Sequence, residues 1–354
     1  MNKIKILHAA DFHIGAPLIN IGKLSDIRRA ELVDTFGKVI RLAKDEKVDA
    51  LLLCGDIFDS ALPSQTAVDS VCAYLNTIPE IKVFITLGNH DAGLKAQFPS
   101  NVHVFGRLIE KIECDLFDVY GASSDEENTI PVIPEGFSVH NPSKINILCL
   151  HADLVGSGQT SRYNPVTPDM LAKTGADYVA LGHIHAYSGI KTAGTVSYAY
   201  PGIPEARGFD ELGEKGVILG VIYKNHTELE FVRVCKRECV EISVDVTGLA
   251  GYNELCSKIS EFAKDKKNLY KINLTGQTDE GILLDTSFIS ERLKDDYFYV
   301  KVNDFTTMKI NIDALSQEYS LRGLFVKKVI EKGGSDIVLK YGLCAVAGEK
   351  VTVD

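Results

Sequence analysis

The feature that most constrains the fold is a set of five short apolar runs, each followed at once by polar residues. The runs read "IKILHAA", "ALLLC", "VFITL", "INILCL" and "YVAL". Their length and β-branched content are typical of buried strands, and helical stretches from Asp26 to Glu46 and from Ser64 to Asn76 separate the first three. Strands alternating with helices predict an α/β sheet, which binds its ligands beyond the strand ends.

The residues behind these runs carry carboxylate, amide and imidazole groups. Glycine introduces three of the five sets, which lets the chain turn tightly and lets the backbone approach a ligand. In an extended backbone, residues two apart point to the same side, so the two histidines of "GHIH" can face one point. We expect the five strand ends to form one rim of one open sheet, where all these groups meet. They are Asp11, His13, Asp56, Asp59, Asn89, His90, His151, His183 and His185.

This donor set indicates a metal site. Nitrogen and oxygen donors without thiolate suit Mn²⁺, Fe²⁺ or Zn²⁺, whereas Mg²⁺ prefers oxygen alone. The donors are too many for one ion and enough for two, with a carboxylate between them. Two ions about 3.5–4 Å apart stabilise both the attacking and the leaving oxygen of a phosphoryl displacement, so the pattern predicts phosphoester hydrolysis. Singly the motifs are weak, and His151 alone would be interpreted as a core histidine; we interpret His8, inside the first strand, as structural.

The rest of the chain predicts further parts. A chain of 354 residues exceeds the usual size of a single core. Residues 177–234 are β-rich, which indicates a second sheet packed on the first, with helices outside. After residue 235, a β-α-β pattern predicts a small separate domain, and the tail is helical from about residue 312. An apolar stripe from Leu321 to Val329 predicts packing within its own domain, with partner docking as the alternative.

Charge and composition limit the function classes. The net charge of −10 argues against a broad basic surface that grips nucleic acid unaided. No run approaches the roughly 18 apolar residues that span a bilayer, and the segment "MNKIKILHAADFHIG" is unlike a secretory signal. The eight cysteines form no C-x-x-C pair, which is typical of free thiols in a reducing compartment. We therefore expect a cytoplasmic protein without a membrane partner.

Taken together, the D-x-H, GDxFD, GNHD, lone histidine and GHxH motifs resemble those of the calcineurin-like metallophosphoesterases. The segments "GDIFDSALPS" and "YPGIPEARGFDELGEKG" are similar to the SbcD-type DNA repair exonucleases, the nuclease subunits of double-strand-break repair complexes. The resemblance covers about residues 1–235. It implies an α/β fold, a four-layer α/β/β/α metallophosphoesterase sandwich with a small α+β capping domain and a helical C-terminal tail. The implied parts are a nuclease domain at 1–235, a DNA-positioning capping domain at 236–305 and a helical segment at 306–354 that is a candidate for partner docking.

The resemblance also implies roles for single residues. His90 would protonate the leaving oxygen or stabilise the charged transition state, with Asp59 orienting it. Arg162 and Arg207 lie in loops that the family shares and are candidates for contacts with substrate phosphates. The implied ligands are Asp11, His13 and His185 for one metal, Asn89, His151 and His183 for the other, and Asp56 between them.

By resemblance the chain is a Mn²⁺-dependent DNA exo/endonuclease, with Fe²⁺, Zn²⁺ and Mg²⁺ as alternative ions. Its expected partners are DNA ends, an SbcC-like ATPase of the SMC family and a second copy of itself. The stretch from Asp69 to Ile78 is either a dimer helix or core-facing. Two other functions stay open: a phosphodiesterase for a small phosphoester or nucleotide, and a weakly active scaffold that binds DNA ends for the ATPase.

Overall fold

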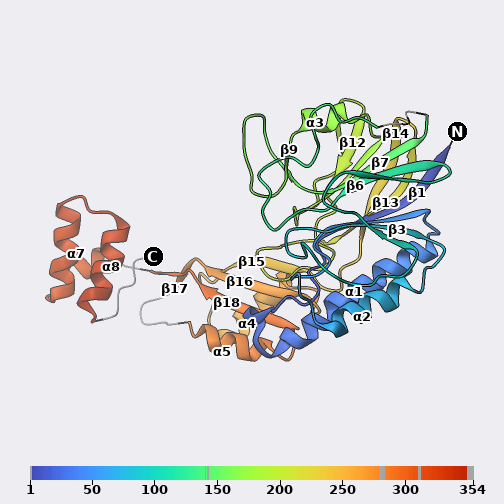
Figure 1. Ribbon diagram of the computed structural model, residues 1–354. Coiled ribbons are helices and arrows are strands. Elements are labelled where there is room, and N and C mark those ends of the chain that lie inside the picture. The colour runs from blue at the N-terminus through green and yellow to red at the C-terminus, as the bar shows by residue number, and fades with distance from the viewer. Residues whose placement is uncertain (1, 140, 142, 279–283, 310–311, 349–354) are drawn as a thin grey trace. The chain divides into compact units, whose positions relative to one another are not determined.

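The computed structural model describes residues 2–139, 141, 143–278, 284–309 and 312–348 (Figure 1). The chain divides into two compact units, Met1–Cys239 and Val240–Asp354. The first unit extends past residue 235, where the sequence placed the end of the nuclease domain, because the backbone N–H groups of Lys236 and Arg237 donate to the buried carboxylate of Glu205. Residues 236–239 therefore belong to the first unit.

Within the described residues, the first unit contains two six-stranded sheets that pack face to face. In the first, four neighbouring strands are parallel, and two further strands, each antiparallel to its neighbour, extend one edge. In the second, the central four strands are parallel and an antiparallel strand lies at each edge. The first sheet has the order β14 (His226–Arg233), β13 (Gly216–Tyr223), β1 (Lys3–Ala9), β2 (Ala50–Cys54), β3 (Lys82–Thr86), β4 (Val102–Val104). The second has the order β11 (Lys191–Ala193), β12 (Val196–Ala199), β10 (Tyr178–Gly182), β7 (Ile145–His151), β6 (Phe117–Ala122), β5 (Glu110–Glu113). A separate two-stranded ladder pairs β8 (Asp153–Leu154) with β9 (Pro165–Val166).

The two sheets do not divide the chain in sequence order. We expected the first sheet to come from the first part of the chain and the second from residues 177–234. Instead β5, β6 and β7 join the second sheet, whereas β13 and β14 return to the first, where β13 pairs antiparallel with β1. The sandwich prediction is confirmed, but the assignment of strands to sheets was wrong, because an apolar run does not specify its pairing partner.

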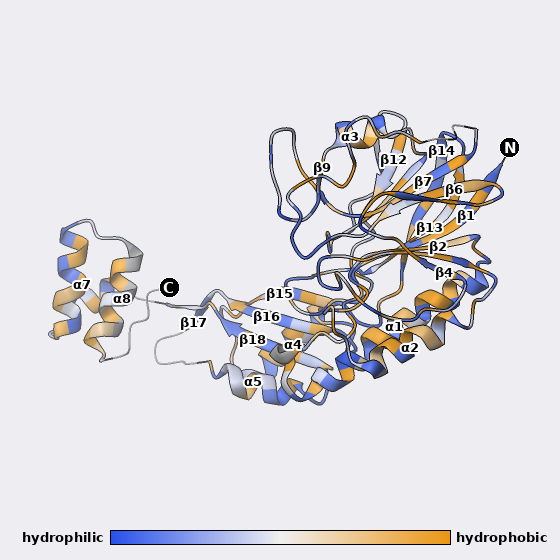
Figure 2. Cartoon of the chain, viewed as in Figure 1, coloured by the Kyte–Doolittle hydropathy of each residue, from blue (hydrophilic) through white to orange (hydrophobic). Residues whose placement is uncertain are grey.

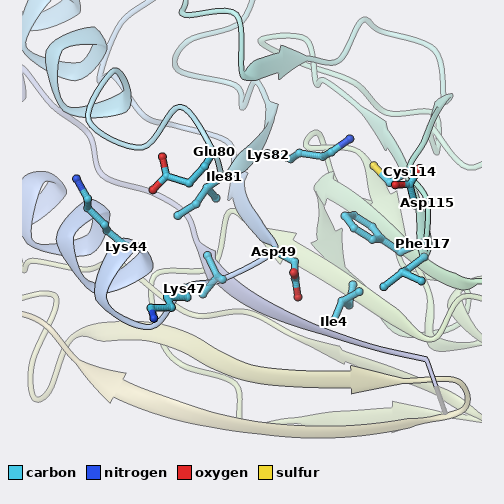
Figure 3. A pocket seen from close by; sticks show the side chains of 12 residues that line it. Ile4, Lys44, Lys47, Asp49, Glu80, Ile81, Lys82, Cys114, Asp115 and Phe117 are labelled. Atoms are coloured by element: carbon cyan, nitrogen blue, oxygen red, sulfur yellow. The ribbon is translucent and has the colours of Figure 1, made fainter.

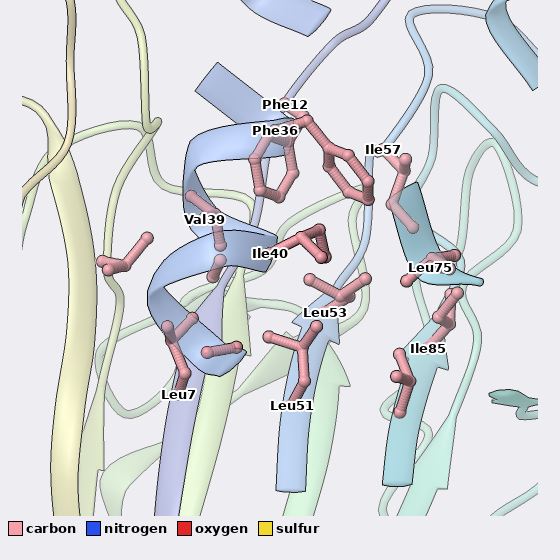
Figure 4. Packing of buried hydrophobic residues seen from close by; sticks show 14 of the residues in the cluster. Leu7, Phe12, Phe36, Val39, Ile40, Leu51, Leu53, Ile57, Leu75 and Ile85 are labelled. Carbon is pink, nitrogen blue, oxygen red and sulfur yellow. The ribbon is translucent and has the colours of Figure 1, made fainter. Parts of the chain in front are cut away.

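Side-chain alternation along the strands builds three apolar layers. Leu7, Leu51 and Leu53 face α1 (Ser25–Asp45) and α2 (Gln65–Leu75), which cover the outer face of the first sheet (Figure 4). Ile6 and Leu52 point the other way, into the core between the sheets. The outer face of the second sheet is covered by loops and by one short helix, α3 (Pro168–Lys173), so the predicted fourth layer is thin.

Local signals explain where the outer helices lie. α2 begins after Ser64, whose hydroxyl accepts a hydrogen bond from the Ala67 N–H and so caps the helix. Val71 and Leu75 are fully buried against the first sheet. The stretch from Asp69 to Ile78 is therefore core-facing on that side, which leaves the homodimer a proposal.

A buried charge cluster holds α1 against the end of the first unit. Arg28, only 1% exposed, pairs with Glu31 at 2.5 Å and with Glu205 at 2.8 Å. Arg237 pairs with Glu31 at 2.9 Å, and Thr35 donates to Glu205 at 3.0 Å. Each buried charge has an opposite partner, which such burial requires. Arg28 is therefore unavailable for contacts with a substrate.

The second unit has its own cores (Figures 1 and 2). A three-stranded sheet packs on two helices, and three further helices enclose a small core around Val326 and Val329. Leu321 and Leu324, from the stripe that we predicted to pack internally, are instead 70% and 60% exposed. The core contacts the other side of their helix, α7 (Leu321–Glu331). None of the described helices is long and apolar enough to cross a membrane. The elements are β15 (Cys239–Asp245), α4 (Tyr252–Phe262), β16 (Leu269–Thr275), β17 (Gln277–Thr278), α5 (Thr286–Leu293), β18 (Tyr299–Asp304), β19 (Thr307–Met308), α6 (Ile312–Ser316), α7 (Leu321–Glu331) and α8 (Asp336–Val346).

His8 provides a test of the packing between the sheets. It is fully buried on β1, and its Nδ1 lies 2.9 Å from the Tyr178 hydroxyl of the second sheet. Burial lowers its pKa from 6.5 to about 3, so the folded state stays neutral where an unfolded histidine takes up a proton. Because the unfolded state then binds more protons, stability falls as the pH drops below 6.5.

We predict that the His8→Gln variant loses less unfolding free energy than the wild type between pH 7 and pH 5, by about 2 kcal/mol. Urea unfolding of both proteins at the two pH values, with a chelator present, measures the difference. An equal loss in both proteins would show that His8 does not titrate as its burial requires.

Candidate metal centre

The polar residues behind the five strands lie together at one end of the sandwich. β1, β2 and β3 belong to the first sheet, and β7 and β10 to the second. Our expectation of a single rim on one open sheet was therefore wrong; the carboxyl ends of parallel strands from two packed sheets form the site. The residues linked there by hydrogen bonds, ion pairs or ring contacts are Asp11, His13, Asp56, Asp59, Asn89, His90, His151, His183 and His185.

The backbone at these strand ends has positive φ angles, which residues other than glycine rarely adopt. Asp11, His13, Asp56 and His183 have φ angles of 56°, 47°, 50° and 109°. A positive φ costs a non-glycine residue on the order of 1 kcal/mol and persists only where the surroundings hold it. Here the Asp11 and His13 N–H groups donate to the carbonyls of Gly55 and Asp56, at 3.0 and 2.9 Å. The first two strand ends are thus tied to each other.

Three glycines allow the strand ends to approach closely. A Cβ on Gly55 would lie 2.0 Å from His151 Nδ1, and one on Gly88 would lie 2.2 Å from Asp56 Oδ1. A Cβ on Gly182 would lie 1.6 Å from the Cys54 carbonyl oxygen. Gly55 and Gly182 are therefore required by the close approach of the two sheets, and Gly88 by the close approach of two neighbouring strand ends of the first sheet.

Two imidazoles point their Nε2 atoms at one place. His13 Nε2 and His185 Nε2 are 3.2 Å apart, while their Nδ1 atoms lie 3.0 Å from Asp59 and 2.7 Å from Glu211. Burial lowers the pKa of His13 to about 4, so its ring is neutral at pH 7. With the ring protons directed to the carboxylates, the two Nε2 lone pairs face each other, an arrangement that a bound cation would relieve.

A second group surrounds Asp56. Its Oδ2 lies 3.4 Å from His151 Nε2 and 3.8 Å from His13 Nε2, and its Oδ1 accepts the His90 N–H at 2.9 Å. His151 Nδ1 is directed to the Cys54 carbonyl at 3.0 Å, and its Nε2 lies 3.1 Å from Asn89 Oδ1. A carbonyl only accepts, so Nδ1 of His151 carries the proton and Nε2 is free to ligate. Asp56 lies between the two sets of imidazoles.

Among the described residues, three sets of side chains have ligand atoms within 4.8 Å of one another. All three use residues that the sequence analysis singled out. His183, whose ring centroid is 5.2 Å from that of His151, lies beside the third set. The sets are Asp11, His13 and His185; His13, Asp56 and His90; and Asp11, Asp56 and His151.

The electrostatics of this cluster favour cations. Burial and the neighbouring charge of Asp56 raise the pKa of Asp11 well above its usual value, and they raise that of Asp91 to about 7. Burial alone would also raise the pKa of Asp56, but the adjacent imidazoles outweigh it and lower that pKa. Burial and His151 lower the pKa of His183 to about 4, so it is neutral at pH 7. Buried carboxylates and neutral imidazoles together fit divalent metal ions.

Sequence reasoning missed two residues at this centre. Asp91 is fully buried; its Oδ1 accepts the Gly88 N–H at 2.7 Å and its Oδ2 the Ile57 N–H at 2.8 Å, which joins two of the loops. Glu211 belongs to a loop, residues 210–215, that is rich in acidic residues. Although burial acts in the opposite direction, the hydrogen bond with His185 and the Arg207 charge lower the Glu211 pKa to about 2. The only sequence signal for Asp91 was its place beside His90.

The remaining predicted residues lie at different distances from the cluster. His90 Nδ1 is 3.3 Å from the Asp59 carbonyl and 3.7 Å from its carboxylate, which lies closer to His13. The Arg207 guanidinium is within the centre, 2.9 Å from Glu211. Arg162 is exposed and forms an ion pair with Glu127 at 3.6 Å.

A pocket of about 670 Å³ lies at the other end of the strands (Figure 3). Ile4, Asp49 and Lys82, at the amino ends of β1, β2 and β3, line it together with Lys44 and Phe117. The candidate ligands from the first sheet follow the carboxyl ends of these strands, at the opposite end of the sheet. This pocket is therefore not part of the metal centre.

The chain is similar to known proteins. The calcineurin-like phosphoesterase family model matches residues 4–187. An "uncharacterized metallophosphoesterase YhaO" of Bacillus subtilis (strain 168) is 30% identical, over 75% of this chain and 69% of that protein. The SbcD subunit of the nuclease SbcCD of the same bacterium is 27% identical, over 59% of this chain and 64% of that protein, so the chain spans about two thirds of both relatives. The crystal structure of the calcineurin-like phosphoesterase YfkN from Bacillus subtilis aligns with a TM-score of 0.43 and 15% identity, over 66% of this chain and 91% of that one.

We predict that Gly182→Ala destabilises the first unit by about 1–3 kcal/mol, because the added methyl group overlaps the Cys54 carbonyl and pushes the sheet ends apart. Urea unfolding measures the loss. Gly106→Ala is the matched control, since its Cβ would lie 3.5 Å from its nearest neighbour, Glu110. Equal stability of the two variants would contradict the close approach of the strand ends.

Proposed function

Because the chain belongs to the calcineurin-like phosphoesterase family, we propose that this metal-dependent phosphoester hydrolase is a two-metal DNA exo/endonuclease. One observation carries the two-metal part: the Asp56 carboxylate lies between the imidazoles of His13 and His151, at 3.8 and 3.4 Å. A carboxylate in this position can ligate an ion on each side.

We assign the ligands to two ions as the resemblance to the metallophosphoesterases implies, with Asp56 between the two sets. Bound as a pair, divalent ions activate a water and neutralise the charge that develops on the phosphoryl oxygens. Mixed nitrogen and oxygen donors favour Mn²⁺, with Fe²⁺, Zn²⁺ and Mg²⁺ as alternatives. One ion would be held by Asp11, His13 and His185, the other by Asn89, His151 and His183, with Asp56 shared.

His90 is the proposed proton donor to the leaving oxygen. Its Nδ1 is anchored by the Asp59 carbonyl, and its side chain is 42% exposed, so the other ring nitrogen can meet a substrate. One of its ring nitrogens also lies within ligand distance of His13 and Asp56, which makes direct ligation the competing role. The Asp56 carboxylate accepts the His90 N–H and fixes the position of the loop.

DNA as the substrate is supported by the similarity to the SbcD subunit of the nuclease SbcCD. From the motifs that resemble those of the SbcD-type exonucleases we propose a complex with an SbcC-like ATPase of the SMC family and a homodimer, and from the cysteine pattern we propose a cytoplasmic location. We also propose that the predicted capping domain, residues 236–305, positions DNA with the part that lies in the second unit, and that the exposed Arg162 meets a phosphate.

A second candidate is a phosphodiesterase for a small phosphoester. The net charge of −10 favours it, as do the carboxylate partners of Arg28 and Arg207, which leave few cations for a DNA backbone. A weakly active scaffold for DNA ends is less well supported, because every expected ligand is present at the centre.

We predict that the purified chain with Mn²⁺ shortens linear duplex or single-stranded DNA and that Asp56→Ala abolishes this activity. Gel analysis of labelled DNA, beside hydrolysis of bis-p-nitrophenyl phosphate, is the measurement. Hydrolysis of the small ester with both DNA forms intact would replace the nuclease proposal with the small-substrate one. Inactivity on all three substrates, with metal bound, would favour the scaffold.

We predict that His90→Asn lowers kcat by about 10²–10⁴-fold, since a general acid contributes on that order, while metal content stays near two ions per chain. Elemental analysis after gel filtration measures the content. Loss of metal together with activity would show that His90 is a ligand and would overturn its role as the proton donor.

A further inference from the structure

A closed chain of polar contacts joins the two imidazoles of the first proposed metal ion. On one side, His13 Nδ1 lies 3.0 Å from Asp59 Oδ1, which accepts from Arg207 at 3.4 Å. On the other, His185 Nδ1 lies 2.7 Å from Glu211 Oε1, which accepts from the Arg207 Nε and from a terminal nitrogen at 3.1 and 2.9 Å. One guanidinium therefore links both carboxylates that orient the imidazoles.

The loop that carries Arg207 is also fastened to the metal centre through its backbone. The Ile203 N–H donates to the His185 carbonyl at 3.1 Å, and a Cβ on Gly202 would lie 2.7 Å from the same oxygen. The Arg207 N–H donates to the second oxygen of Glu211 at 2.6 Å. The loop and the "GHIH" turn thus form one rigid piece.

The chemistry of the linkage suits a metal ligand. A carboxylate that accepts the Nδ1 proton fixes the tautomer with a bare Nε2 and makes that nitrogen more basic. Two carboxylates placed behind neighbouring imidazoles would repel each other without a cation between them. Arginine supplies that cation in a planar fork which a lysine cannot match. Glu211 is 5% exposed and Arg207 is 23% exposed, so water screens the linkage weakly.

We propose that Arg207 and Glu211 are positioning residues for one metal ion. Glu211 orients His185 directly, and Arg207 holds Asp59 and Glu211, so that His13 and His185 keep the spacing and the tautomer needed to bind the ion. This rests on the proposed two-metal function. It gives Arg207 a role inside the metal centre in addition to the expected contact with a substrate phosphate, because its three guanidinium nitrogens donate to Asp59 and Glu211.

The test is calorimetric titration of the metal-stripped full chain with Mn²⁺. We expect two sites in the wild type, and in Glu211→Gln a loss of affinity of about 10–100-fold at one site while the other is unchanged. Arg207→Met should weaken the same site, and Arg207→Lys should restore part of the affinity. Glu214→Gln is the matched control, because it removes the same charge from an exposed position of the same loop.

Electron paramagnetic resonance of the Mn²⁺-loaded proteins gives a second readout. The wild type should show the signal of two coupled ions, and Glu211→Gln at limiting metal should show a single ion. If Glu211→Gln fails to fold, judged by circular dichroism without metal, Arg207→Lys and Arg207→Met carry the comparison.

The outcomes separate the two proposals. A wild type that binds fewer than two ions would overturn the two-metal function itself. A wild type that binds two ions with Glu211→Gln and Arg207→Met unchanged would overturn the positioning role alone. Equal weakening of both sites would also overturn it, since a general structural defect would have that effect.

Discussion

The contact between His151 and the Cys54 carbonyl joins the two sheets at the point where both end. It crosses from β7 to β2, and it turns the free nitrogen of His151 toward the carboxylate that follows β2. Gly55 and Gly182 leave the space for it, because a side chain at either position would overlap the facing strand end. The apolar core between the sheets supplies the packing energy that holds this contact and the positive φ angles around it.

The candidate site could be predicted from the sequence because its members follow a local rule: each comes directly after a buried strand. The distribution of strands between the sheets could not, since β7 and β10 look like β1 and β2 until pairing is known. The prediction of one rim therefore named residues that do lie together, but it gave a wrong reason for it. The parallel strands of both sheets end on the same side, so the site is formed by strand ends from two sheets and not from one.

Glu211 and Arg28 show where local patterns fail. Glu211 is 26 residues from His185, and only the tertiary fold brings its loop to the imidazole. Arg28 resembles a surface arginine on an amphipathic helix, yet its partners Glu31 and Glu205 lie with it in the interior. An exposed and a buried charged residue look the same in a sequence. Long-range ion pairs in the fold decide which of them can be buried.

The buried charge cluster also ties the end of the first unit to its interior. The backbone of residues 236–237 is held by Glu205, and the side chain of Arg237 is held by Glu31, so releasing this segment would uncover desolvated charges. Glu205 lies two residues before Arg207 in the sequence. The end of the first unit and the loop that braces the metal centre therefore share one anchor point.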